Sequence, residues 1–101
     1  MPDWYLYIVR CNDGTLYTGI TTNIARRFRE HRGGGTRGAG YMRGRVPLEV
    51  VYSQQLPDRG SASRAEYAVK QLPKTRKEML AAGSVTLEQI VSETHHRQDD
   101  S

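Results

Sequence analysis

The fold is decided by the stretch from Trp4 to Ile20, which reads WYLYIVRC, then NDG, then TLYTGI. Its first part, Trp4 to Cys11, is rich in aromatic and β-branched residues and predicts a strand. Asn12-Asp13-Gly14 is a turn signal, and Thr15 to Ile20 predicts the strand that returns. The stretch therefore predicts a β-hairpin.

The length of the hairpin loop decides where two tyrosines point. A two-residue loop at Asp13-Gly14 would put Tyr7 and Tyr17 on opposite faces of the hairpin, because side chains alternate along a strand. A three-residue loop with Gly14 in the left-handed conformation would put both tyrosines on one face. Shared chemistry requires the second arrangement, and the position of the glycine favours it.

The apolar pattern predicts further elements after the hairpin. Thr22 or Asn23 can cap a helix that ends near Arg32, with Ile24 and Phe28 on its core side. Then we expect a glycine-rich loop at 33–44, a strand at 47–54, a helix from Ser61 or Ser63 to Leu72, and a helix from Lys74 to Ala82 that Gly83 ends. This ββαβαα order predicts an α+β (mixed α/β) fold, a small three-stranded antiparallel-type sheet flanked by helices.

The chain length of 101 residues suits one hydrophobic core. We expect residues 1–83 to form the domain and 84–101 to add a short amphipathic segment and an acidic tail, disordered from His95. No window approaches the ~18 apolar residues of a membrane helix. The lone Cys11 cannot form an internal disulfide, which favours a reducing, cytoplasmic setting.

Charge is distributed unevenly along the chain. Residues 1–83 carry 14 Lys and Arg against 7 Asp and Glu, whereas residues 84–101 carry 1 against 4. Seven arginines lie between Asn23 and Arg45, and the guanidinium fork matches phosphate in two-point contacts. The patch indicates a polyanionic partner, most plausibly nucleic acid, with a merely solvated basic face as the alternative.

Arg27 and Glu66 are the residues best suited to phosphodiester chemistry. A fixed guanidinium at Arg27 would stabilise charge that builds on phosphorus, although Arg27 also fits a solvated arginine on a basic helix. A carboxylate at Glu66 could hold Mg²⁺ or Mn²⁺. The alternative for Glu66 is a capping box, Ser63-x-x-Glu66, in which the glutamate reaches back to the helix start.

Three aromatic side chains complete the set. Tyr7 and Tyr17 are candidates for a general base and for positioning water or phosphate, and ordinary strand packing is their alternative. A phenol has a pKa near 10, so a basic role requires cations to lower it, and Arg27, His31 and a metal could do so. His31 could hydrogen-bond a tyrosine or phosphate or relay a proton, or simply be a polar residue at a helix end.

Tyr5-Leu6-Tyr7 and Tyr17-Thr18-Gly19, followed by Arg27-x-x-x-His31, resemble the GIY-YIG nuclease family over roughly residues 4–82. The likeness is greatest to its small single-domain YhbQ-like bacterial branch. The resemblance implies paired tyrosines at Tyr7 and Tyr17, a phosphate arginine at Arg27, an accessory histidine at His31 and a metal ligand at Glu66.

The resemblance also implies a function. We expect a monomeric, metal-dependent endonuclease that hydrolyses DNA, selects structured or single-stranded substrates with little sequence specificity, and acts in DNA repair. The alternatives are a non-catalytic DNA- or RNA-binding module and a nuclease subunit that depends on a partner. The residues expected to contact nucleic acid are Arg26, Arg29, Arg32, Arg37, Tyr41, Arg43, Arg45 and Lys70.

Overall fold

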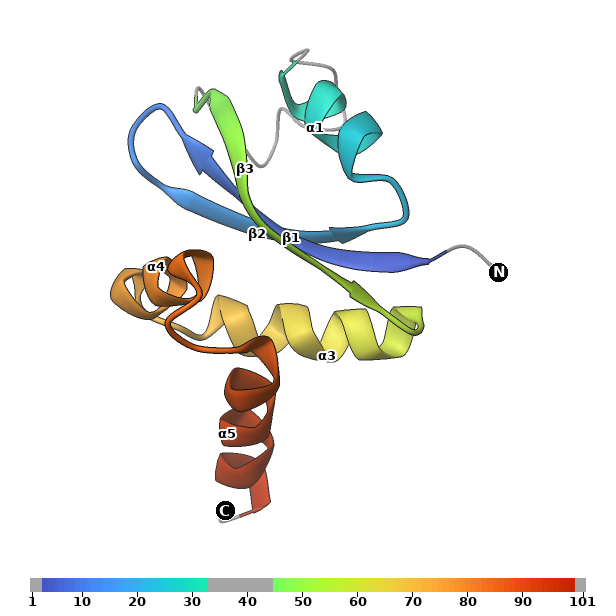
Figure 1. Ribbon diagram of the computed structural model, residues 1–101, viewed down its shortest axis with the longest axis vertical. Coiled ribbons are helices and arrows are strands. Elements are labelled where there is room, and N and C mark those ends of the chain that lie inside the picture. The colour runs from blue at the N-terminus through green and yellow to red at the C-terminus, as the bar shows by residue number, and fades with distance from the viewer. Residues whose placement is uncertain (1–2, 33–44, 100–101) are drawn as a thin grey trace.

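The computed structural model describes residues 3–32 and 45–99, with helices on both faces of a three-stranded sheet (Figure 1). The elements in chain order are β1 (Trp4–Cys11), β2 (Leu16–Thr21), α1 (Ile24–Arg32), β3 (Pro47–Leu56), α3 (Arg59–Lys70), α4 (Lys74–Ala82) and α5 (Leu87–Asp99). The central strand β1 pairs antiparallel with β2 on one side and β3 on the other. Helix α1 lies over one face, and α3 and α4 lie over the other. The predicted α+β fold is confirmed.

The hairpin closes through the three-residue loop that shared chemistry requires. The Cys11 N–H donates to the Thr15 carbonyl at 2.9 Å, and the Gly14 N–H donates to the Cys11 carbonyl at 2.9 Å. Gly14 has a φ of +85°, the left-handed conformation that glycine adopts without strain. In the resulting register Tyr7 faces Gly19 and Val9 faces Tyr17, so Tyr7 and Tyr17 share one face of the sheet as predicted.

The hydrophobic core lies on the opposite face, beneath α3. Leu6 and Ile8 alternate with Tyr7 along β1 and are completely buried there. Small alanines on the inner side of α3 let the helix approach the sheet closely. The core also contains Leu16, Ala65, Ala68, Val69, Leu80, Leu87 and Ile90.

Helix α3 begins earlier than predicted. The Asp58 carboxylate accepts a 2.7 Å hydrogen bond from the Ser61 N–H and caps the helix, so the predicted starts at Ser61 and Ser63 are wrong. Ser63 therefore lies inside α3, and the capping-box alternative for Glu66 is excluded. The end of α4 follows the prediction, because Gly83 takes a left-handed φ of +83°.

The C-terminal segment forms the helix α5. Leu87 and Ile90 enter the core, and α5 packs against α3. The helix continues to Asp99, and 100–101 lie outside the described residues. Disorder from His95 stays a prediction. Across residues 3–32 and 45–99, no helix is both long and apolar enough to cross a membrane.

Candidate active site

Tyr7 is the centre of a polar cluster on the α1 face of the sheet. Its side chain is only 2% exposed, and its ring lies over the backbone of Gly19 on the neighbouring strand. A Cβ atom at position 19 would come within 2.5 Å of the Tyr7 Oη and 2.7 Å of its Cζ. Gly19 is therefore required for the close approach of this ring, a role that the sequence motif alone did not explain.

Helix α1 brings His31 against this tyrosine. The Asn23 side chain caps the helix by accepting a 3.0 Å hydrogen bond from the Arg26 N–H, so Asn23 is the cap rather than Thr22. His31 is 3% exposed, and its Nε2 lies 3.2 Å from the Tyr7 Oη. Tyr17 contacts the His31 ring in an edge-on arrangement with centroids 5.3 Å apart.

The burial of His31 corrects the predicted orientation of α1. The sequence placed Ile24 and Phe28 on the core side of the helix, but both are only half-buried and neither belongs to the core. His31 is instead the buried residue of α1. The helix thus faces the sheet with a polar group, because the sheet offers it a phenol as a partner.

The electrostatics of Tyr7 are dominated by burial. Burial, followed by the nearby Tyr17, raises the pKa of Tyr7 to about 12, while a hydrogen bond from Arg27 and its charge act in the opposite direction. A basic role would require cations that lower this pKa, and the Arg27 guanidinium alone does not outweigh the loss of solvent. Tyr7 is a neutral phenol at neutral pH.

The phenolic proton of Tyr7 has an acceptor in His31. The Tyr7 Oη lies 3.2 Å from His31 Nε2, and the nearby guanidinium of Arg27 can only donate. We therefore assign the Tyr7 O–H as the donor to His31 Nε2. Burial and then the charge of Arg27 lower the pKa of His31, against a smaller effect of Glu30, which favours the neutral imidazole.

Because Nε2 accepts the hydrogen bond from Tyr7, the neutral imidazole of His31 carries its proton on Nδ1. This buried atom has no hydrogen-bond partner within the part of the chain that is described. An unpaired buried polar group costs about 1–3 kcal/mol of folding stability, so native structures contain few of them. Functional sites are prominent among the places where they occur.

Arg27 is held by a residue that the sequence analysis did not select. Its Nη1 donates to the Glu30 carboxylate at 3.1 Å, and its side chain is 23% exposed. Arg27 is therefore a fixed, partly buried cation beside Tyr7, which goes against the interpretation that it is merely solvated. The i, i+3 spacing of Arg27 and Glu30 was the available signal.

Glu66 reaches the site from α3. Its side chain is 25% exposed, and its carboxylate pairs with the Lys70 ammonium at 3.2 Å. The charge of this carboxylate also acts on Tyr7. No group of three or more His, Cys, Asp and Glu side chains that could hold a metal occurs within residues 3–32 and 45–99. A single accessible carboxylate fits Mg²⁺ or Mn²⁺, since such ions bind proteins through one or two carboxylates together with water and substrate phosphates.

The residues predicted to contact nucleic acid divide into two groups. Arg37, Tyr41 and Arg43 lie outside the described residues. The others are placed: Arg26, Arg29, Arg32, Arg45 and Lys70 are all exposed.

Four of these exposed cations already have partners in the fold, and the first is Arg26, which pairs with Glu30 at 3.9 Å. Arg32 donates to the Pro47 carbonyl at 2.7 Å and thereby ties α1 to β3. Arg45 pairs with Asp13 at 3.0 Å, and Lys70 pairs with Glu66. Contact of these residues with nucleic acid stays a prediction.

Comparison with known proteins identifies the family. A family model described as the GIY-YIG catalytic domain matches residues 3–79. The chain belongs to the GIY-YIG family. Its motif residues at Tyr7, Tyr17, Arg27, His31 and Glu66 all lie within the matched range.

The relatives of this GIY-YIG chain are bacterial proteins of its own size class. A UPF0213 protein of Desulfotalea psychrophila is 55% identical over 83 residues, which are 82% of this chain and 74% of that protein. The UPF0213 protein YhbQ of Salmonella arizonae is 45% identical over 91% of this chain and 90% of its own length. The predicted YhbQ-like branch is confirmed.

A solved structure supports the same placement. The solution structure of a UPF0213 protein from Bacillus halodurans, BH0048, is 42% identical and superimposes with a TM-score of 0.51. The match covers 79% of this chain and 83% of that one.

Proposed function

We propose that this protein is a metal-dependent endonuclease that hydrolyses DNA phosphodiester bonds. The observation that carries the proposal is the contact of Tyr7, Arg27 and His31 on the face of the sheet opposite the core, with Glu66 electrostatically coupled to Tyr7. Membership of a nuclease family gives the general class, and this cluster supplies the groups that the reaction needs.

The Tyr7–His31 pair would accept the proton of the attacking water. Water forms a bond to phosphorus while the bond to the leaving oxygen breaks, and the water proton passes to Tyr7 Oη as the phenolic proton moves to His31 Nε2. The leaving oxygen takes its proton from solvent. A raised pKa at Tyr7 is compatible with this step, because the phenol exchanges protons without existing as a free phenolate.

Arg27 and a metal ion held by Glu66 would stabilise the negative charge of the transition state. Arg27, fixed by Glu30, would stabilise the charge that develops on the non-bridging phosphate oxygens. A Mg²⁺ or Mn²⁺ ion bound at Glu66 would supply stabilisation of the leaving oxygen. The half-exposed Tyr17, in contact with the His31 ring, would position water or phosphate.

The substrate follows from the kind of contacts that the protein offers. Exposed arginines on α1, such as Arg26 and Arg29, suit phosphates, which carry no sequence information. Such contacts give little sequence specificity, and we propose structured or single-stranded DNA as the substrate and a role in DNA repair. Action as a monomer in the cytoplasm stays a prediction.

A second candidate function is a nucleic-acid-binding module without catalysis. It is favoured by the Glu66–Lys70 ion pair, which occupies the carboxylate that the metal needs. The two functions share the basic surface, so binding alone does not separate them.

A gel cleavage assay separates the two functions. Single-stranded, duplex, flap and branched DNA are incubated with Mg²⁺, Mn²⁺ or EDTA, using wild type, Arg27→Ala and Glu66→Ala, with Arg59→Ala as the control, since that guanidinium lies over the Trp4 ring. Metal-dependent cutting that both site variants lose and Arg59→Ala keeps supports the nuclease. Binding by all four proteins with no cutting by any supports the binding module instead.

A further inference from the structure

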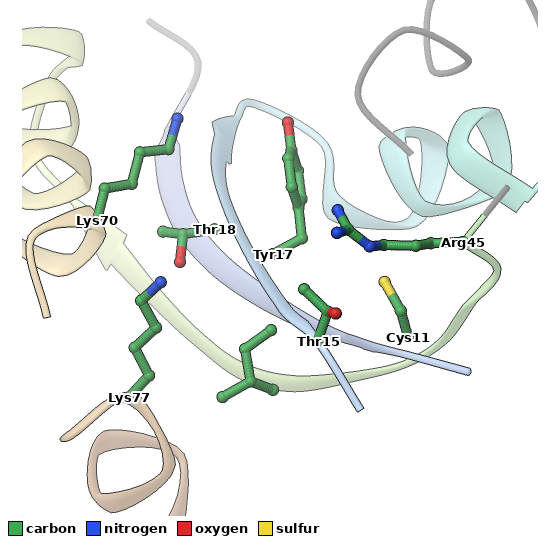
Figure 2. Close-up of a pocket in the computed structure, with 8 residues that line it drawn as sticks. Cys11, Thr15, Tyr17, Thr18, Arg45, Lys70 and Lys77 are labelled. Atoms are coloured by element: carbon green, nitrogen blue, oxygen red, sulfur yellow. The ribbon is translucent and has the colours of Figure 1, made fainter. Parts of the chain in front are cut away.

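A cavity of about 210 Å³ lies at the open edge of the sheet, beside β2 (Figure 2). Three cations from different parts of the chain line it: Lys70 from α3, Lys77 from α4 and Arg45 ahead of β3. No acidic side chain is among its lining residues. The cavity is therefore suited to an anion.

A buried hydroxyl in the wall of this cavity lacks a partner. Thr18 lines the cavity and is 3% exposed, yet its Oγ1 makes no hydrogen bond within the described residues. In Figure 2 its side chain is drawn between those of Lys70 and Lys77. A hydroxyl can donate to an anion, so an anion bound here would remove the cost of leaving this group unpaired.

The edge of β2 adds a backbone donor. The bond from the Cys11 N–H to the Thr15 carbonyl fixes which pairs of the hairpin exchange hydrogen bonds, and the register then turns the Thr18 N–H away from β1. Backbone N–H groups together with ammonium groups are common phosphate ligands. A water occupies about 30 Å³ in the liquid, so the cavity has room for the four oxygens of a phosphate.

Two residues connect the cavity to the candidate active site. Tyr17 lines the cavity and also contacts the His31 ring, while Lys70 lines the cavity and also pairs with Glu66. A phosphate in the cavity would compete with the Glu66 carboxylate for Lys70. Its binding would therefore leave Glu66 freer to bind a metal.

We propose that the cavity lined by Thr18, Lys70 and Lys77 is a phosphate-binding subsite that holds a phosphate of the nucleic acid next to the one being cleaved. This inference rests on the proposed function for the identity of the larger substrate. The phosphate could belong to an internal diester or to a strand end, and both present the same anionic oxygens.

Metal-free titrations followed by amide NMR test the subsite without any cleavage. Inorganic phosphate is added in EDTA to wild type, Lys77→Met and Thr18→Val, with Lys74→Met as a control that removes the same charge from the same helix outside the cavity wall. We expect shifts at the Thr18 amide, and a dissociation constant raised about tenfold by Lys77→Met and about threefold by Thr18→Val. Lys74→Met should change it less than about twofold.

Thr18→Ser separates the hydroxyl from any effect on folding. This variant keeps the hydroxyl, so it should bind phosphate as wild type does, whereas Thr18→Val should not. Equal weakening by Lys74→Met and Lys77→Met would show a diffuse charge effect and overturn the subsite. Absence of shifts at Thr18 would overturn it as well.

Oligonucleotides with and without a 5′-phosphate then identify the source of the phosphate. If Lys77→Met weakens the binding of both oligonucleotides, the bound phosphate is an internal diester. If it weakens only the binding of the oligonucleotide with the 5′-phosphate, the bound phosphate is a strand end. Either result supports the subsite, and equal binding of both by wild type and Lys77→Met counts against it. Because no step requires cutting, the subsite can fail while the nuclease stands, and the reverse.

Discussion

The two faces of the sheet are made by alternate residues of the same strands, yet they differ in chemistry. On the α3 face, Leu6 and Ile8 meet alanines and leucines in a dry core. On the α1 face, Tyr7 meets a histidine and an arginine. Tyr7 and Ile8 are both buried, at 2% and 0% exposure, so burial alone does not distinguish the site from the core.

The difference lies in the side chains that each face buries. The α3 face buries apolar carbon, which is favourable without any partner. The α1 face buries a phenol and an imidazole, and it leaves His31 Nδ1 without a hydrogen bond among the described residues. A fold under selection for stability alone would fill this face with apolar side chains, so the polar cluster is best explained by chemistry.

The largest expected effect comes from Glu66, the candidate metal ligand, which acts on Tyr7 from α3. Glu66→Gln should reduce the cleavage rate by at least about 10³-fold, because an amide is a much weaker ligand for Mg²⁺ than a carboxylate. DNA binding measured in EDTA should change less than about twofold, since it depends on phosphate contacts elsewhere. Glu49→Gln, an exposed carboxylate on β3, serves as control. Activity in Glu66→Gln close to wild type would exclude the metal role.

A methyl group at Gly19 tests the geometry of the polar face. Gly19→Ala places a Cβ within 2.5 Å of the Tyr7 Oη, so the ring must move away from His31. We expect the rate to fall about 10²-fold from this displacement and stability to fall by about 1–3 kcal/mol. Gly60→Ala in α3 is the matched control, because its Cβ would meet nothing closer than 3.5 Å. Cleavage kinetics measure the rate of both variants, and urea unfolding measures their stability. A fully active Gly19→Ala would contradict the geometry.

The proton acceptor on this face predicts the pH dependence of the rate. The pKa of His31 lies below its usual 6.5, so the rate should fall about tenfold per pH unit below that lowered pKa. The same shift means that the unfolded chain takes up the proton first, so folding stability is lost as pH falls below 6.5. On the alkaline side, Tyr7 should stay protonated until about pH 12. A pH–rate profile checks this, and a rate that rises on acidification would refute the acceptor role of His31.

The smallest expected effects belong to the exposed arginines. If DNA is held through about five phosphate contacts, a plot of the logarithm of affinity against the logarithm of salt concentration should have a slope near −4. Arg29→Ala should reduce the size of this slope by about 0.7–0.9. Arg59→Ala is the control, since that guanidinium lies over the Trp4 ring on another element. Fluorescence anisotropy at several salt concentrations measures both slopes. An unchanged slope in Arg29→Ala would remove this residue from the interface.

The sequence predicted those features that neighbouring residues decide. The bounds of β1, the left-handed Gly14 and the helix stop at Gly83 each depend on local chemistry, and each is found as predicted. The start of α3 was missed because Asp58, Ser61 and Ser63 are all good caps. The choice among them depends on where β3 ends, which the local pattern does not state.

The sequence could not predict features that depend on contacts between distant elements. The residue types at Tyr7 and His31 were identifiable, but the raised pKa of Tyr7 comes from burial beneath a helix 24 residues away. The same holds for Thr18, whose missing partner becomes visible only when α3 and α4 enclose the edge of β2.

The central claim is that one face of the sheet carries the chemistry and the other carries the stability. Tyr7 and Ile8 test this claim, because they are neighbours in β1 whose side chains lie on opposite faces. We would measure the cleavage rate and unfolding free energy of Tyr7→Phe beside Ile8→Ala. Tyr7→Phe should lose at least about 10²-fold in rate while stability falls by about 1–2 kcal/mol, because His31 Nε2 loses its hydrogen bond. Ile8→Ala should lose about 3 kcal/mol of stability and keep its rate per folded molecule. A Tyr7→Phe variant that cuts DNA as well as wild type would contradict the account.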